Sequence, residues 1–249
     1  MKQIRVALWM AIVGGVLTTV AFLMSFFNAE VQQFGTVTFA QQIKTVFPLL
    51  GSGAGGFMYA RPWFSQKIFY FHVPFAEASF LVFTVAAFFA VRFLMTKRKE
   101  YDTRTRVAME TSLVFVVLTL ITGDLWTKAS WGVWWEWEPR LTTYFIMTLL
   151  MIAYFVLRNS LEDEERRAVY SAVFAIIAWI DAPISFFITR VIPSDHPVVF
   201  KSGMATSNLI PFIVAQVGML LIGYAVYQLR LHEERLRERI EVVKESLEG

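Results

Sequence analysis

The chain has 249 residues, of which 56% are hydrophobic and 16% aromatic, and its net charge is +3 with no cysteine. Its mean hydropathy of +0.52 and its long continuous apolar runs predict an integral membrane protein. The lack of cysteine excludes a CxxCH attachment motif, a CxxC redox pair and thiolate metal sites, and the charge indicates no nucleic-acid partner.

A helix needs about 20 apolar residues to cross a bilayer. Six stretches qualify, so the predicted fold class is an all-α integral membrane protein with six transmembrane helices. The first stretch is too long for the apolar region of a cleaved signal peptide and predicts a retained signal-anchor helix. The predicted spans are roughly 6–27, 68–94, 107–123, 141–158, 168–189 and 209–229.

Lysine and arginine are distributed unevenly between the two sides of these spans. With the N-terminus inside, sixteen of the 23 Lys and Arg residues lie in inner segments and seven in outer ones. Because inner loops are enriched in positive charge, both termini are predicted to face the cytoplasm. The loop between the third and fourth spans, His72 and His196 are then all expected on the outer face of the membrane.

The chain is predicted to divide into a six-span membrane domain, residues 1–230, and a cytoplasmic amphipathic C-terminal helix, residues 231–249. The stretch GSGAGG, in the first outer segment (about 28–67), fits the spacing of a dinucleotide-binding loop. No βαβ unit surrounds it, so we reject a nucleotide site and expect a flexible turn or a re-entrant segment.

The most unusual segment is WGVWWEWEPR, residues 131–140. One interpretation is an aromatic belt, because indole rings favour the membrane interface. Clustering in a single loop favours instead a flat apolar platform for a large planar ligand. If the segment is helical, Trp131, Trp134 and Trp135 share one face.

The end of this segment carries a proline and charged residues. Pro139 is suited to the first helical position of the fourth span. Arg140 has a planar guanidinium that pairs with carboxylates, either those of a ligand or those of Glu136 or Glu138.

Two of the three histidines accompany this segment on the predicted outer face. His72 precedes a Val-Pro pair that favours a helix start, and His196 lies in a proline-bounded turn. A lone histidine is more often a structural polar residue than a ligand. The pair fits haem iron, which needs two axial ligands, better than zinc, which needs three or four.

Asp181 is an ionisable residue inside the fifth span, followed by Pro183. Intramembrane carboxylates are costly and are commonly functional or paired. It marks either a proton or solute path, or a carboxylate that is satisfied by backbone groups freed where Pro183 breaks the helix.

These residues resemble the WWD family of haem-handling membrane proteins of cytochrome c maturation, and within it the CcmC type. The resemblance covers most of the chain and rests on IFYFHVPFAE, WGVWWEWEPRLTT and DAPISFF…DHP. The family usually ends its tryptophan motif with Asp-Ala-Arg-Leu-Thr, whereas this chain has Glu138 and Pro139 before Arg140.

The resemblance implies that haem b is bound non-covalently at the outer face of the bacterial inner membrane, with His72 and His196 as axial ligands. It implies delivery to a periplasmic haem chaperone, with an ABC-type ATPase, its membrane subunits and a small single-span subunit as further partners. No catalytic residue is assigned. The haem-contacting residues implied by the tryptophan motif are Trp131, Gly132, Trp134, Trp135, Trp137, Glu138 and Arg140.

Two alternatives stay open at the level of sequence. One is a related WWD synthetase that attaches haem to apocytochrome c, although such proteins tend to have more spans and additional histidines. The other is a polytopic transporter or scaffold without a cofactor, in which Asp181 lies on a transport path.

Overall fold

The computed structural model describes residues 2–27, 29, 55–194, 196 and 204–248, and all regular structure in this part of the chain is α-helical. Most of the first outer segment, including residues 51–54 of the GSGAGG stretch, lies outside the described residues. The helices are α1 (Lys2–Phe27), α3 (Gly55–Thr96), α4 (Lys99–Trp131), α5 (Pro139–Asn159), α6 (Glu164–Val191) and α7 (Thr206–Glu248).

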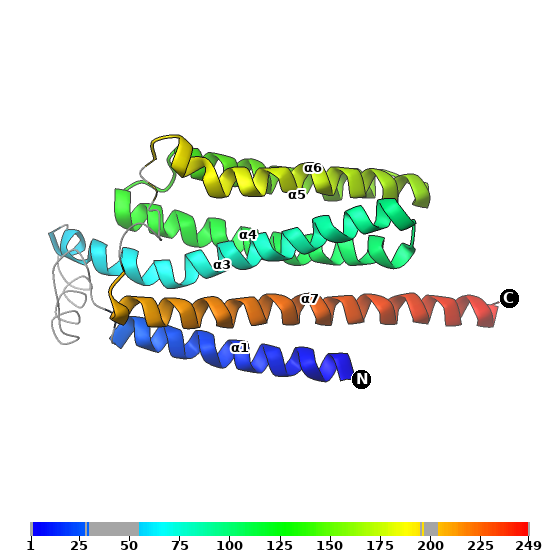
Figure 1. Ribbon diagram of the computed structural model, residues 1–249, viewed down its shortest axis with the longest axis horizontal. Helices are drawn as coiled ribbons and strands as arrows, with labels where there is room; N and C mark the ends of the chain where they lie inside the picture. Colours follow the sequence, from blue (N-terminus) through cyan, green and yellow to red (C-terminus); the bar gives the residue numbers. More distant parts are fainter. Residues whose placement is uncertain (1, 28, 30–54, 195, 197–203, 249) are drawn as a thin grey trace.

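All six helices are long and apolar enough to cross a membrane, which confirms the predicted six-span, all-α fold class. Figure 1 shows a bundle in which successive helices run in opposite directions. The two chain ends lie at the same end as the α3–α4 and α5–α6 connections, and the α4–α5 connection lies at the opposite end. Every helix extends beyond its predicted span.

The tryptophan segment lies between two helix ends that its own residues define. α4 ends at Trp131 because Gly132, with φ 85°, takes the left-handed conformation that stops a helix. α5 begins at Pro139, as predicted. Residues 133–138 between them are not helical, so the expectation that three tryptophans share one helix face is wrong.

Helices pack mainly as the pairs α3 with α4, α5 with α6, and α1 with α7 (Figure 1). Small residues on one helix let a neighbouring backbone approach closely within a membrane. The buried face of α6 carries Ala168, Ala172, Ala175, Ala178 and Ala182. Larger buried side chains in the same core include Phe83, Met147, Met151 and Tyr154.

Glycine permits the close crossing of α1 and α7. A Cβ atom on Gly14 would lie 2.7 Å from the carbonyl oxygen of Gly218. A Cβ atom on Gly218 would lie 2.6 Å from Thr18 Oγ1. Side chains larger than hydrogen would therefore push the two helices apart.

In the described residues, neither the helix start predicted beside Pro74 nor the helix break predicted at Pro183 occurs. α3 begins at Gly55 and continues through Pro74, so the expectation of a helix start beside His72 is wrong. α6 likewise continues through Pro183, and Asp181 Oδ2 accepts no hydrogen bond from the described residues. The interpretation of Asp181 as a carboxylate satisfied at a helix break is therefore wrong. Packing against neighbouring helices lets membrane helices retain proline.

α7 runs unbroken from Thr206 to Glu248, so the predicted C-terminal amphipathic segment continues the last apolar helix. Its end projects past the other helices in Figure 1. The apolar residues Leu236, Ile240, Val243 and Leu247 are exposed there. The division of the chain at residue 231 stays a prediction.

Candidate functional site

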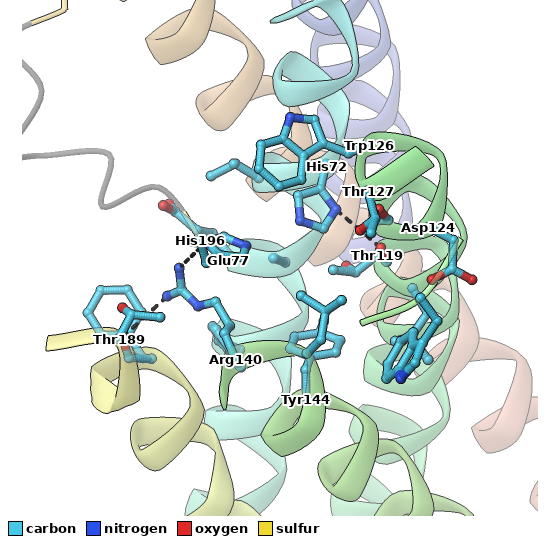
Figure 2. Close-up of a pocket in the computed structure, with 18 of the residues that line it drawn as sticks. His72, Glu77, Thr119, Asp124, Trp126, Thr127, Arg140, Tyr144, Thr189 and His196 are labelled. Atoms are coloured by element: carbon cyan, nitrogen blue, oxygen red, sulfur yellow. Dashed lines mark hydrogen bonds between the residues drawn. The ribbon is translucent and has the colours of Figure 1, made fainter. Parts of the chain in front are cut away.

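A largely apolar pocket lies at the end of the bundle that carries the α4–α5 connection (Figure 2). Its empty space, part of it open to the outside, is about 940 Å³. Helices α3, α4, α5 and α6 and the segment after α6 contribute its walls, which include His72, Glu77, Trp126, Trp135, Arg140, Arg190 and His196.

The structure brings the two histidines together in this pocket. The ring centres of His72, on α3, and His196, after α6, are 6.4 Å apart, and their planes are inclined by 43°. Two imidazoles that bind one metal ion through bonds of about 2 Å have ring centres roughly 6 Å apart. The described residues contain no group of three or more His, Cys, Asp or Glu side chains placed to hold a metal ion. Two converging imidazoles fit the two axial positions of a haem iron.

His72 is oriented by α4. Its Nδ1 lies 3.2 Å from the carbonyl oxygen of Thr119 and 3.2 Å from Thr122 Oγ1. A carbonyl oxygen only accepts, so Nδ1 donates its proton and Nε2 keeps the lone pair that a metal needs. A Cβ atom on Gly123 would lie 3.0 Å from His72 Cε1, so glycine leaves room for the ring.

His196 has contacts of a different kind. Arg140 Nη1 lies 3.3 Å from its Nδ1, and because a guanidinium only donates, this nitrogen accepts. The Trp126 ring centre lies 5.7 Å from the imidazole centre. The backbone N–H of His196 donates to Ser194 Oγ at 3.1 Å. A helix thus positions His72, while a short non-helical segment and Arg140 position His196.

Glu138 connects the start of α5 to the segment that carries His196. Its Oε1 accepts the backbone N–H of Leu141 at 2.6 Å, which caps α5. Its Oε2 accepts the hydroxyl of Ser194, the same hydroxyl that receives the His196 N–H. The carboxylate is buried but does not line the pocket. Its geometry is that of a residue that positions His196.

Replacing Glu138 with alanine is expected to lower the free energy of unfolding by about 1–2 kcal/mol, because the helix cap and the Ser194 hydrogen bond are both lost. The segment around His196 should also become more accessible. Because the chain has no cysteine, maleimide labelling of an Ile192→Cys variant measures that accessibility directly. Labelling should be faster with Glu138→Ala.

Glu136 provides the matched control, because it is an exposed glutamate in the same loop. Glu136→Ala should leave both the unfolding free energy and the labelling rate unchanged. Equal labelling rates in the Glu138→Ala and Glu136→Ala backgrounds would contradict the positioning role of Glu138.

The tryptophans of residues 131–140 take three different positions. Trp135 lines the pocket, and its buried Nε1 donates to none of the described residues. Trp131 packs edge-on against Trp126, with 5.2 Å between ring centres. Trp134 and Trp137 are 58% and 70% exposed and do not line the pocket. Trp135 therefore forms part of the pocket wall, and Trp131 supports Trp126. Trp134 and Trp137 form an exposed aromatic surface.

Most of the other pocket residues, including Trp126 and Arg190, were not among the sequence-predicted site residues. Trp126 lies on α4 within the same cluster of tryptophans and contacts His196, so its position near the motif was an available signal. Arg190 lies in the last turn of α6, where basic residues commonly only complement the helix dipole, so nothing in the sequence marked it.

The fold and pocket together define a class of protein: a multi-pass helical membrane protein with a tryptophan-lined, two-histidine pocket at one end of its bundle. The model of the heme exporter protein C family matches residues 55–246, which is most of the chain. The chain therefore belongs to the heme exporter protein C (CcmC) family, as the resemblance in sequence implied.

Individual relatives support this assignment. Heme exporter protein C of Bradyrhizobium diazoefficiens is 29% identical over 179 residues, which cover 70% of this chain and 68% of the relative. A ccmC-like mitochondrial protein of cytochrome c biosynthesis from Marchantia polymorpha is 33% identical over 123 residues, 49% of this chain and 51% of the relative. Heme exporter protein C of Escherichia coli K12 is 28% identical over 120 residues, which cover 48% of this chain and 49% of the relative. The last two matches span about half of each relative.

Proposed function

We propose that this protein holds haem between His72 and His196 and delivers it to a soluble haem chaperone in the periplasm. Membership of the heme exporter protein C family supports a role in haem handling for cytochrome c maturation. The observation that carries the proposal is the convergence of the two imidazoles, 6.4 Å between ring centres, beside an aromatic pocket.

Binding without a covalent bond agrees with the composition, since no cysteine is present to form a thioether. The two axial ligands would then act differently. His72 is fixed by α3 and by its contacts with α4, whereas His196 is on a non-helical segment. One rigid and one adjustable ligand suit a site that must both retain haem and release it.

The tryptophan segment would hold and present the porphyrin. Trp135 and Trp126 would contact its faces or edges, and Arg140 would face a carboxylate group of the ligand. We assign support of the loop and presentation of the site to Trp131, Gly132, Trp134, Trp137 and Glu138.

The six apolar helices and the bacterial relatives support a multi-pass protein of the inner membrane. The distribution of Lys and Arg supports cytoplasmic termini, which would place the pocket on the periplasmic side. The family name supports membership of a haem-export complex. Within that complex we propose an ABC-type ATPase and its membrane subunits, a small single-span subunit and the chaperone as partners.

Haem transfer by the purified protein tests this function. Loaded with haem in lipid nanodiscs, it should show the absorption spectrum of a six-coordinate, low-spin iron. Mixing with the apo-chaperone should move haem faster than passive loss to a scavenger such as apomyoglobin. Transfer to the chaperone at the rate of passive loss would contradict a delivery role, and the absence of any haem spectrum would contradict haem binding.

A further inference from the structure

Two guanidinium groups meet at one backbone carbonyl at the edge of the pocket. Arg140 Nη2, from α5, lies 3.3 Å from the carbonyl oxygen of Phe186, and Arg190 Nη1, from α6, lies 3.0 Å from the same oxygen. Both guanidinium carbons also lie over the Phe186 ring, at 5.8 and 4.8 Å from its centre. Residues from two helices thus place two permanent positive charges side by side.

Within the described part of the chain, neither arginine has a carboxylate within salt-bridge distance. The oxygens of Glu138 are engaged by Leu141 and Ser194. Glu77 lines the same pocket without pairing with either guanidinium. A guanidinium has five N–H donors, so most donors of both arginines are still available. Two adjacent cations with spare donors form a receptor for two carboxylates, or for one doubly charged anion.

The hydrogen bond from Arg140 to His196 must break before His196 can bind a metal through Nε2. With Nδ1 accepting from Arg140, the proton of a neutral His196 is on Nε2. Ligation of a metal through Nε2 requires the proton on Nδ1, where it would face an N–H of Arg140. Arg140 must then release His196, and an anion beside Arg190 would give its guanidinium a new partner.

We infer that Arg190, together with Arg140, forms a binding site for the two propionate carboxylates of haem, and that Arg140 exchanges His196 for a carboxylate when the ligand binds. This inference rests on the proposed function. A phosphate of an anionic lipid headgroup has related chemistry, so the experiment separates the two sources.

The test compares haem with haem dimethyl ester, which keeps the iron and the ring but lacks both charges. Dissociation constants are measured by absorption titration in phosphatidylcholine nanodiscs. Wild type should prefer the diacid, and Arg190→Gln should weaken diacid binding by about tenfold while changing ester binding less than twofold. Arg166→Gln, an exposed arginine at the other end of α6, removes the same charge and should change neither constant.

Arg190→Lys keeps the charge without the planar fork and should recover part of the preference. An equal diacid-to-ester ratio in wild type and Arg190→Gln would overturn the inference while leaving haem binding intact. Loss of the wild-type preference when phosphatidylglycerol is added would overturn it in favour of a lipid phosphate. Failure of wild type to bind either compound would instead overturn the proposed function, and this inference with it.

Discussion

Replacing His72 with alanine should abolish the six-coordinate haem spectrum and weaken haem binding by more than about a hundredfold. Loss of an outer contact to a metal-binding histidine already costs about 10–100-fold, so loss of the ligand itself should cost more. His72 is the better positioned of the two histidines, because α4 fixes its Nδ1 through Thr119 and Thr122. Absorption titration with haem measures both effects.

The smaller side chain leaves space that free imidazole can fill. Adding imidazole to His72→Ala should restore the six-coordinate spectrum, which a variant that has merely unfolded would not do. His232→Ala is the matched control, since His232 is the third histidine of the chain and lies on α7 outside the pocket. The same spectrum and affinity in wild type and His72→Ala would show that His72 is not a ligand.

The tryptophan segment, residues 131–140, was only partly predictable from the sequence. Its composition predicted an aromatic platform, and Pro139 correctly predicted the start of α5. The shape of the segment was not predictable from helical spacing, because Gly132 ends α4 immediately after Trp131. A single residue at positive φ thus changed which indole rings lie on the same side.

The effect of the prolines on helix continuity was also not predictable from the sequence. Local preference disfavours helix before proline, and on that ground a helix start was expected beside Pro74 and a helix break at Pro183. Both helices continue through these residues. In a membrane bundle, packing on all sides and the lack of competing water outweigh the cost of placing a proline inside a helix. The number of spans was predictable because it depends on apolar length, whereas helix continuity depends on neighbours.

Contacts between distant segments were the least predictable part of the site. The link from Glu138 to Ser194 and the approach of Arg140 to Arg190 at Phe186 each join α5 to α6 or to the segment that follows it. Sequence spacing carries no information on such approaches. The histidine pair was predictable because the predicted spans place both residues on the same side of the membrane, and because the resemblance to the WWD family implied both as ligands.

Removing one partner of the buried ion pair Asp102–Arg158 should cause the largest loss of stability among the changes considered. The two side chains join α4 to α5 near the end of the bundle opposite the pocket, through bonds of 2.8 and 2.6 Å. Both are buried. Asp102→Ala leaves the Arg158 guanidinium buried without its carboxylate, and breaking such a pair typically costs about 3–5 kcal/mol. Unfolding in mixed micelles gives the change in free energy.

The double variant distinguishes an unpaired charge from a lost attraction. Asp102→Leu with Arg158→Leu removes both charges and should be much more stable than Asp102→Ala, because no ion is left to be desolvated alone. Lys99→Gln is the control, since Lys99 pairs with Glu164 at 3.7 Å in an exposed position and should contribute little. Equal losses in the single and double variants would mean that the attraction itself stabilises the bundle. Because the pair lies far from the pocket, haem affinity of the folded variants should match wild type, which separates stability of the bundle from function of the site.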